Sequence, residues 1–155
     1  MKFSVYLVGL MLLSGLAKAS VEAPMAQASD SRVADSLTVL RDKRWNHGAI
    51  DCSTSEEPAI GVFQYDTSSF ILRQSKCLNF EAPFIYLLIG ETEALVVDTG
   101  ATESADDFPI YGTIKSLIEE HSPNGDSKPI TVVHSHSHGD HRAGDGQFSD
   151  PQVSV

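Results

Sequence analysis

Three histidines and one aspartate fall within a short run near the end of the printed chain: His136, His138, Asp140 and His141. In an extended segment, side chains two residues apart point to the same side, so His136 and His138 are predicted to face one cation. Gly139 leaves the backbone free to turn, and Asp140 and His141 are then expected to reach a neighbouring position. The spacing therefore predicts two adjoining cation sites.

Imidazole nitrogens and carboxylate oxygens are the ligands that catalytic zinc favours, and they also suit iron or manganese. A bound divalent ion lowers the pKa of its water from about 16 towards about 7, which makes hydroxide available at neutral pH. This chemistry predicts hydrolysis, with Asp140 as the candidate catalytic residue that steers the hydroxide or accepts its proton. The alternative is a histidine-rich tract that takes up metal adventitiously. The β-branched run Ile130, Val132 and Val133 disfavours it, since it predicts a buried strand ending at the histidines.

The sequence VVHSHSHGDHRAG, from Val132 to Gly144, resembles the HxHxDH region of the metallo-β-lactamase-fold hydrolases. ALVVDTG, from Ala94 to Gly100, resembles the strand ending in Asp-Thr-Gly that precedes the metal motif in that superfamily. The resemblance implies an α/β fold, an αββα sandwich of which this chain supplies about the first half. It also implies that Asp98 orients a ligand histidine or braces the loop instead of binding metal. An aspartate that merely ends a strand at a turn is the alternative.

The resemblance implies a hydrolase with two zinc ions, with iron or manganese as alternatives, that attacks an ester, thioester, lactone or β-lactam-type carbonyl. Members of the superfamily take further ligands from segments well downstream, and no histidine follows His141 here. The alternation Val153-Ser154-Val155 is also typical of a strand that continues. The chain is therefore expected to be the N-terminal part of a longer hydrolase. A non-catalytic periplasmic zinc-binding protein and an inactive truncated fragment remain open alternatives.

Residues 1–19 have the features of a secretory signal peptide: Lys2, an apolar run from Phe3 to Ala17, and small residues for cleavage at Ala17-Lys18-Ala19. An apolar run of about fifteen residues is too short to span a bilayer, which needs about twenty. We therefore expect a periplasmic or secreted protein without a membrane anchor after cleavage. Export permits a disulfide between Cys52 and Cys77, and buried free thiols are the alternative.

The charge balance is acidic, with 11 Lys and Arg against 21 Asp and Glu and a formal net charge of −10. Such a charge repels phosphate backbones, so no nucleic-acid partner is expected and a small-molecule substrate is favoured. The oligomeric state stays open.

The chain divides into a polar leader over residues 20–57 and a domain portion over residues 58–155. In the leader, Val33, Leu37 and Leu40 stand at the spacing of one short amphipathic helix. In the domain portion, four apolar runs predict strands, and a helical period predicts a helix over one side of the sheet that ends at residues 122–125. The runs are residues 60–63, 70–72, 84–89 and 94–97. The unbroken apolarity of the last two predicts burial on both faces.

Four other residues are interpreted as structural or surface residues, and two of them also have a functional alternative. His47, His121 and His134 are expected to be structural or solvated, with a place in the lining of the site as the alternative for His134. Arg142 is expected to be a surface residue at the start of the next helix, with contact to an anionic substrate as the alternative.

Overall fold

The computed structural model describes residues 35–45 and 48–155. The predicted signal peptide, the first part of the leader and His47 lie outside these residues. Residues 35–42 are helical, which places the short helix of the leader, although Leu37 is 44% exposed. Within the described part of the chain, no helix has the length and apolar character needed to cross a membrane.

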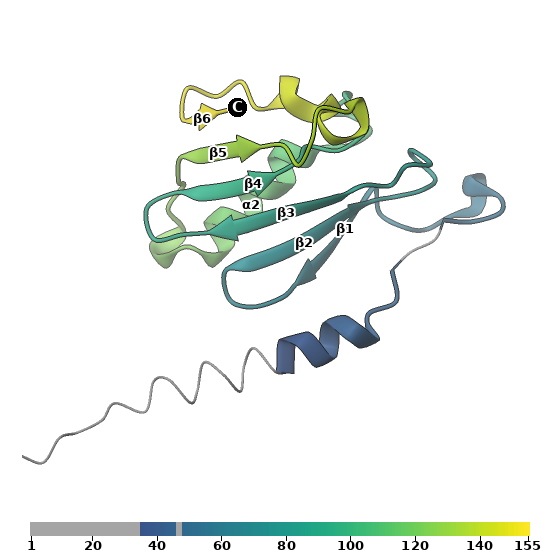
Figure 1. Ribbon diagram of the computed structural model, residues 1–155, viewed down its shortest axis with the longest axis horizontal. Coiled ribbons are helices and arrows are strands. Elements are labelled where there is room, and N and C mark those ends of the chain that lie inside the picture. The colour runs from purple at the N-terminus through teal and green to yellow at the C-terminus, as the bar shows by residue number, and fades with distance from the viewer. Residues whose placement is uncertain (1–34, 46–47) are drawn as a thin grey trace, which may run out of the picture.

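The domain portion forms one mixed sheet in which the strands follow one another in chain order, β1-β2-β3-β4-β5-β6 (Figure 1). The first four strands are antiparallel neighbours, whereas β5 and β6 run parallel to β4. All four apolar runs are confirmed as strands, and the α/β class is confirmed with them. The strands are β1 (Ile60–Gln64), β2 (Ser69–Gln74), β3 (Phe84–Ile89), β4 (Ala94–Val97), β5 (Ile130–Val133) and β6 (Val153–Ser154).

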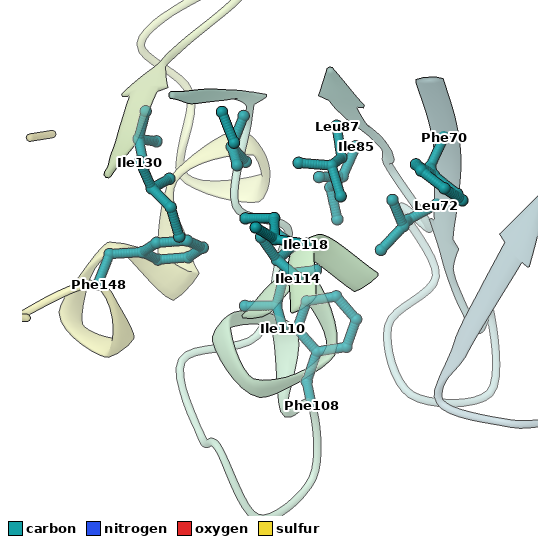
Figure 2. Packing of buried hydrophobic residues seen from close by; sticks show 13 residues of the cluster. Phe70, Leu72, Ile85, Leu87, Phe108, Ile110, Ile114, Ile118, Ile130 and Phe148 are labelled. Carbon is teal, nitrogen blue, oxygen red and sulfur yellow. The ribbon is translucent and has the colours of Figure 1, made fainter. Parts of the chain in front are cut away.

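Helix α2 (Ile110–His121), which connects β4 to β5, covers one face of the sheet. Its buried side carries Ile110, Ile114 and Ile118, at the predicted helical spacing, and a 3-10 turn, η2 (Pro123–Gly125), follows it. Figure 2 shows these isoleucines beneath inward-facing side chains of the strands. The core cluster is Phe70, Leu72, Ile85, Leu87, Ala94, Val96, Phe108, Ile110, Ile114, Ile118, Ile130, Val132 and Phe148.

The prediction that β3 is buried on both faces is wrong for the residues that the structure describes. The strand alternates, with Ile85 and Leu87 fully buried under α2, whereas Tyr86 is 42% and Leu88 44% exposed on the other face. The strand is continuously apolar, but α2 covers only one of its faces. The second sheet of the predicted sandwich is not among the described elements.

A disulfide and an aromatic cluster attach the leader to the domain. Cys52, which starts a short 3-10 helix, η1 (Cys52–Thr54), forms a disulfide with Cys77 after β2. Trp45 packs edge-on against Phe63 and Phe84, with ring centroids 5.8 and 4.9 Å away. The structure thus selects the disulfide over free thiols, and it shows that the end of the leader lies against the sheet.

Candidate metal centre

The candidate centre is built where β4 and β5 end side by side. These strands are parallel and Val97 pairs with Val133, so the residues that follow each strand emerge at the same edge of the sheet. The amide of Asp98 donates to the carbonyl of Val133 at 2.8 Å, which extends the pairing by one step. The strand predicted to end at the histidines is confirmed.

The loop after β5 is closed back onto the end of β4. It passes through two 3-10 helices, η3 (Gly139–His141) and η4 (Ala143–Gln147). The amide of Thr99 donates to the carbonyl of His141 at 2.8 Å, and the amide of Ala143 donates to the carbonyl of Gly100 at 2.9 Å. This close approach needs a glycine at position 144, because a Cβ there would lie 2.4 Å from the carbonyl oxygen of Thr99.

Three of the four predicted ligands form a compact group. His136, Asp140 and His141 each offer one ligand atom, and these atoms lie within 4.8 Å of one another. The Nε2 atom of His141 is 3.2 Å from Oδ2 of Asp140, and the ring centroids of His136 and His141 are 4.0 Å apart. His138 lies outside this group, although its ring centroid is 4.7 Å from that of His136. The predicted division into a His136/His138 site and an Asp140/His141 site stays a prediction.

Asp98 lies directly beneath this group and is 2% exposed. Its Oδ1 accepts the amide of Ser135 at 2.7 Å, and its Oδ2 lies 2.7 Å from Nδ1 of His141. Burial by itself raises the pKa of Asp98, but the hydrogen bonds with His141 and Ser135 outweigh it and hold the pKa below the ordinary value. An ionised Asp98 therefore accepts a hydrogen bond from the N–H group at Nδ1 of His141. The Nε2 atom of that ring is then left directed at the cluster.

Ser135 links the two histidines of the cluster, and the sequence analysis did not single it out. Its hydroxyl oxygen lies 2.8 Å from Oδ2 of Asp98, 3.0 Å from Nδ1 of His136 and 3.2 Å from Nδ1 of His141. The hydroxyl has one proton, which it donates to the carboxylate, so its oxygen accepts the Nδ1 proton of His136. Both rings then present Nε2 to the cluster. The available signal was a small polar residue between a buried strand and the first ligand.

His134 lies below the loop between two carboxylates. Its Nδ1 is 3.9 Å from Oδ1 of Asp98, and its Nε2 is 3.2 Å from Oδ1 of Asp145. Neither ring nitrogen makes an aligned hydrogen bond within the described structure. Asp145 instead accepts the hydroxyl of Thr99 at 2.8 Å, which also holds η4 against β4.

The two remaining residues with open interpretations have structural contacts. The side chain of Arg142 is 51% exposed and lies 3.5 Å from Asp145, as expected for a surface residue before a helix. His121 places Nδ1 3.0 Å from the carbonyl oxygen of Leu117 and packs edge-on against Phe70.

The donor set fits a divalent cation. Catalytic zinc is commonly held by three protein ligands drawn from histidine and carboxylate, with one position open. Two imidazoles and one carboxylate converge here, and a buried carboxylate orients one of the rings. His136 is exposed, while Asp140 and His141 are half-buried, so the cluster is accessible from solvent. The arrangement can bind a metal ion and leave room for a ligand from solution.

Comparison with known proteins agrees with this geometry. No curated protein matched the chain. The model of the metallo-beta-lactamase superfamily matches residues 78–152, a range that includes Asp98, Ser135 and all four predicted ligands. This similarity supports a metal-dependent, hydrolase-type function in general terms. Over residues 78–152, the chain is therefore similar to the metallo-beta-lactamase superfamily.

Proposed function

We propose that the protein is a zinc-dependent hydrolase that acts on an ester, thioester, lactone or β-lactam-type carbonyl of a small molecule. The observation that carries the proposal is the convergence of donor atoms from His136, Asp140 and His141 within 4.8 Å. The superfamily match over residues 78–152 supports the same class of reaction.

His136, Asp140 and His141 would hold the first ion, and His138 is close enough to His136 to contribute to a second. When bound, a divalent cation supplies Lewis acidity, which acidifies water and polarises a carbonyl oxygen. Iron and manganese suit the same donors. The expectation that further ligands come from a longer chain stays a prediction.

Other residues of the chain orient the ligand side chains and can accept a proton. Asp98 and Ser135 fix the ring orientations of His141 and His136, so that both rings are in place before substrate binds. Asp140 is half-buried beside His141 and can accept a proton from water at the cluster. The loop around them is open to solvent, as a small-molecule substrate requires.

We also propose that the protein works in the periplasm or outside the cell. The signal-like N-terminus supports this location. The Cys52–Cys77 disulfide supports it independently, since such bonds persist in oxidising compartments.

The decisive experiment measures zinc binding and hydrolysis on the same protein. We expect the purified full-length protein, with its downstream segments, to bind zinc in equilibrium dialysis, and to cleave a member of a thioester, lactone and β-lactam panel with zinc but not after chelation. Asp140→Asn should lose both properties, whereas Asp106→Asn, at an exposed position in the loop before α2, should keep them. Zinc bound without turnover of any panel member would instead favour the non-catalytic zinc-binding protein. Absence of zinc binding would overturn the proposal.

A further inference from the structure

A second potential binding site lies beside β1, and β2 and β3 separate it from the strands that carry the candidate metal centre. A cavity of about 710 Å³ lies beside the edge strand β1, between the end of the leader and the residues that close β2. Its lining includes Lys43, Arg44, Trp45, Arg73 and Ser75. None of these residues takes part in the centre built on β4 and β5.

The lining of this cavity is positively charged in a protein that is negatively charged overall. Three cations and one carboxylate, Glu57, line it, whereas the whole chain has 11 basic and 21 acidic side chains. Among the described residues, no carboxylate lies within 4.0 Å of the charged nitrogens of Lys43, Arg44 or Arg73. Three positive charges without an ionic partner favour an anion from solution.

Arg73 is the best-positioned of the three cations. Its Nε atom donates to the carbonyl of Ala82 at 3.4 Å, and its guanidinium carbon lies 4.7 Å from the centre of the Phe84 ring. These contacts hold one side of the guanidinium and leave its terminal nitrogens for a ligand. A guanidinium held in this way matches the two oxygens of a carboxylate or a phosphate.

Trp45 adds an aromatic surface next to the cations. Its ring is held by edge contacts with Phe63 and Phe84, and Nζ of Lys43 lies 5.5 Å from its centre. The Cys52–Cys77 disulfide ties the same part of the leader to the end of β2. The cavity therefore combines cations with a fixed aromatic wall, which suits an anion that carries an apolar or aromatic group.

We propose that this cavity is a binding site for a small organic oxyanion, a carboxylate or a phosphate monoester with an aromatic or apolar body. Arg73, Lys43 and Arg44 bind the charged group, and Trp45 contacts the body. The inference does not depend on the metal centre.

The chain contains one tryptophan, so its fluorescence reports on this cavity alone. The full chain, treated with chelator to remove metal, is titrated with phenyl phosphate, benzoate, inorganic phosphate and benzyl alcohol. We expect a saturable change with an aromatic anion, weaker binding of inorganic phosphate, and none of benzyl alcohol. The first two arms distinguish a phosphate monoester from a carboxylate. No saturable change with either aromatic anion, or equal binding of benzyl alcohol, would overturn the proposal.

Variants separate this site from general attraction of anions. Lys43→Gln/Arg44→Gln changes two exposed side chains and should weaken binding by about tenfold or more, since hydrogen bonds to charged groups are the strong ones. Arg73→Gln should weaken it similarly if the variant keeps the wild-type circular dichroism spectrum. Lys115→Gln, on the exposed side of α2, should bind as the wild type does. Equal losses in the Lys43/Arg44 and Lys115 variants would overturn the proposal.

Discussion

The ligand loop and the end of the leader are held against the sheet by different physical means. At the β4–β5 edge, the ligand loop is held by hydrogen bonds that converge on one buried carboxylate, Asp98. At the β1 edge, the end of the leader is held by a disulfide and by the packing of Trp45 against two aromatic rings. Polar networks fix the direction of side chains, whereas a cross-link restricts the chain without orienting any donor. The difference predicts that each edge can be damaged while the other is spared.

The largest effect is expected from removal of the disulfide. Cys52→Ser/Cys77→Ser opens a link between residues separated by 25 positions, which should lower the free energy of unfolding by about 2–5 kcal/mol. Denaturant titration measures this loss, and the fluorescence of Trp45 should report a changed β1 edge. Zinc affinity should be unchanged in the folded variant. A parallel loss of zinc affinity would show that the two edges are coupled.

The next effect concerns the close approach of η4 to β4. In Gly144→Ala, the new Cβ would meet the backbone oxygen of Thr99, so the loop must move, at a cost of about 1–3 kcal/mol. Thermal unfolding and zinc binding should both be affected. Gly146→Ala is the matched control, because nothing lies within 4 Å of a Cβ built there. Equal behaviour of the two variants would contradict the proposed closure of the loop.

Asp98→Asn tests the carboxylate at the centre of the polar network. Asp98 has a φ of 68°, a left-handed conformation that asparagine also tolerates, so the backbone should be retained. Loss of this support for His141 should weaken zinc binding by about 10–100-fold, measured by competition with a chromophoric chelator. The response of Trp45 to anions should stay unchanged, and a change there would contradict the separation of the two edges.

The same residue sets a pH dependence. Because the pKa of Asp98 is lowered in the folded state, this carboxylate contributes its full stabilisation at any pH above the pKa that Asp98 has in the unfolded chain. That contribution is lost as the pH falls through the folded value. The difference in unfolding free energy between wild type and Asp98→Asn should therefore shrink on acidification. If the difference in unfolding free energy grew as the pH falls, the proposed stabilisation by the ionised Asp98 would be contradicted.

The smallest effect is expected at Ser135. Removing its hydroxyl in Ser135→Ala should weaken the free energy of zinc binding by about 0.5–1.5 kcal/mol, which is roughly a 2- to 12-fold loss of affinity. Ser135→Thr keeps the hydroxyl and should restore the affinity. Ring nitrogen NMR of the metal-free protein should show a mixture of His136 tautomers in the alanine variant only. A purely packing role would leave the tautomers unchanged.

The sequence predicted the strands, α2 and the ligand motif, because these depend on local periodicity and on neighbouring residues. The place of Asp98 beneath the loop came from a resemblance, and the structure explains it through the parallel pairing of Val97 with Val133. The roles of Ser135 and Gly144 depend on contacts with β4 across about forty residues, which no local pattern encodes. The exposed face of β3 was missed for a similar reason, since an apolar strand does not say which of its faces is covered.

The closed ligand loop has a consequence for the thermodynamics of metal uptake. His141 and Ala143 in the loop are bonded to Thr99 and Gly100, which follow β4, and the two ring orientations are set by neighbours within the protein. Little chain entropy remains to be lost when a cation enters. Calorimetry of zinc binding should accordingly record a heat-capacity change near zero. Small metallo-domains that fold only when their ion binds behave differently.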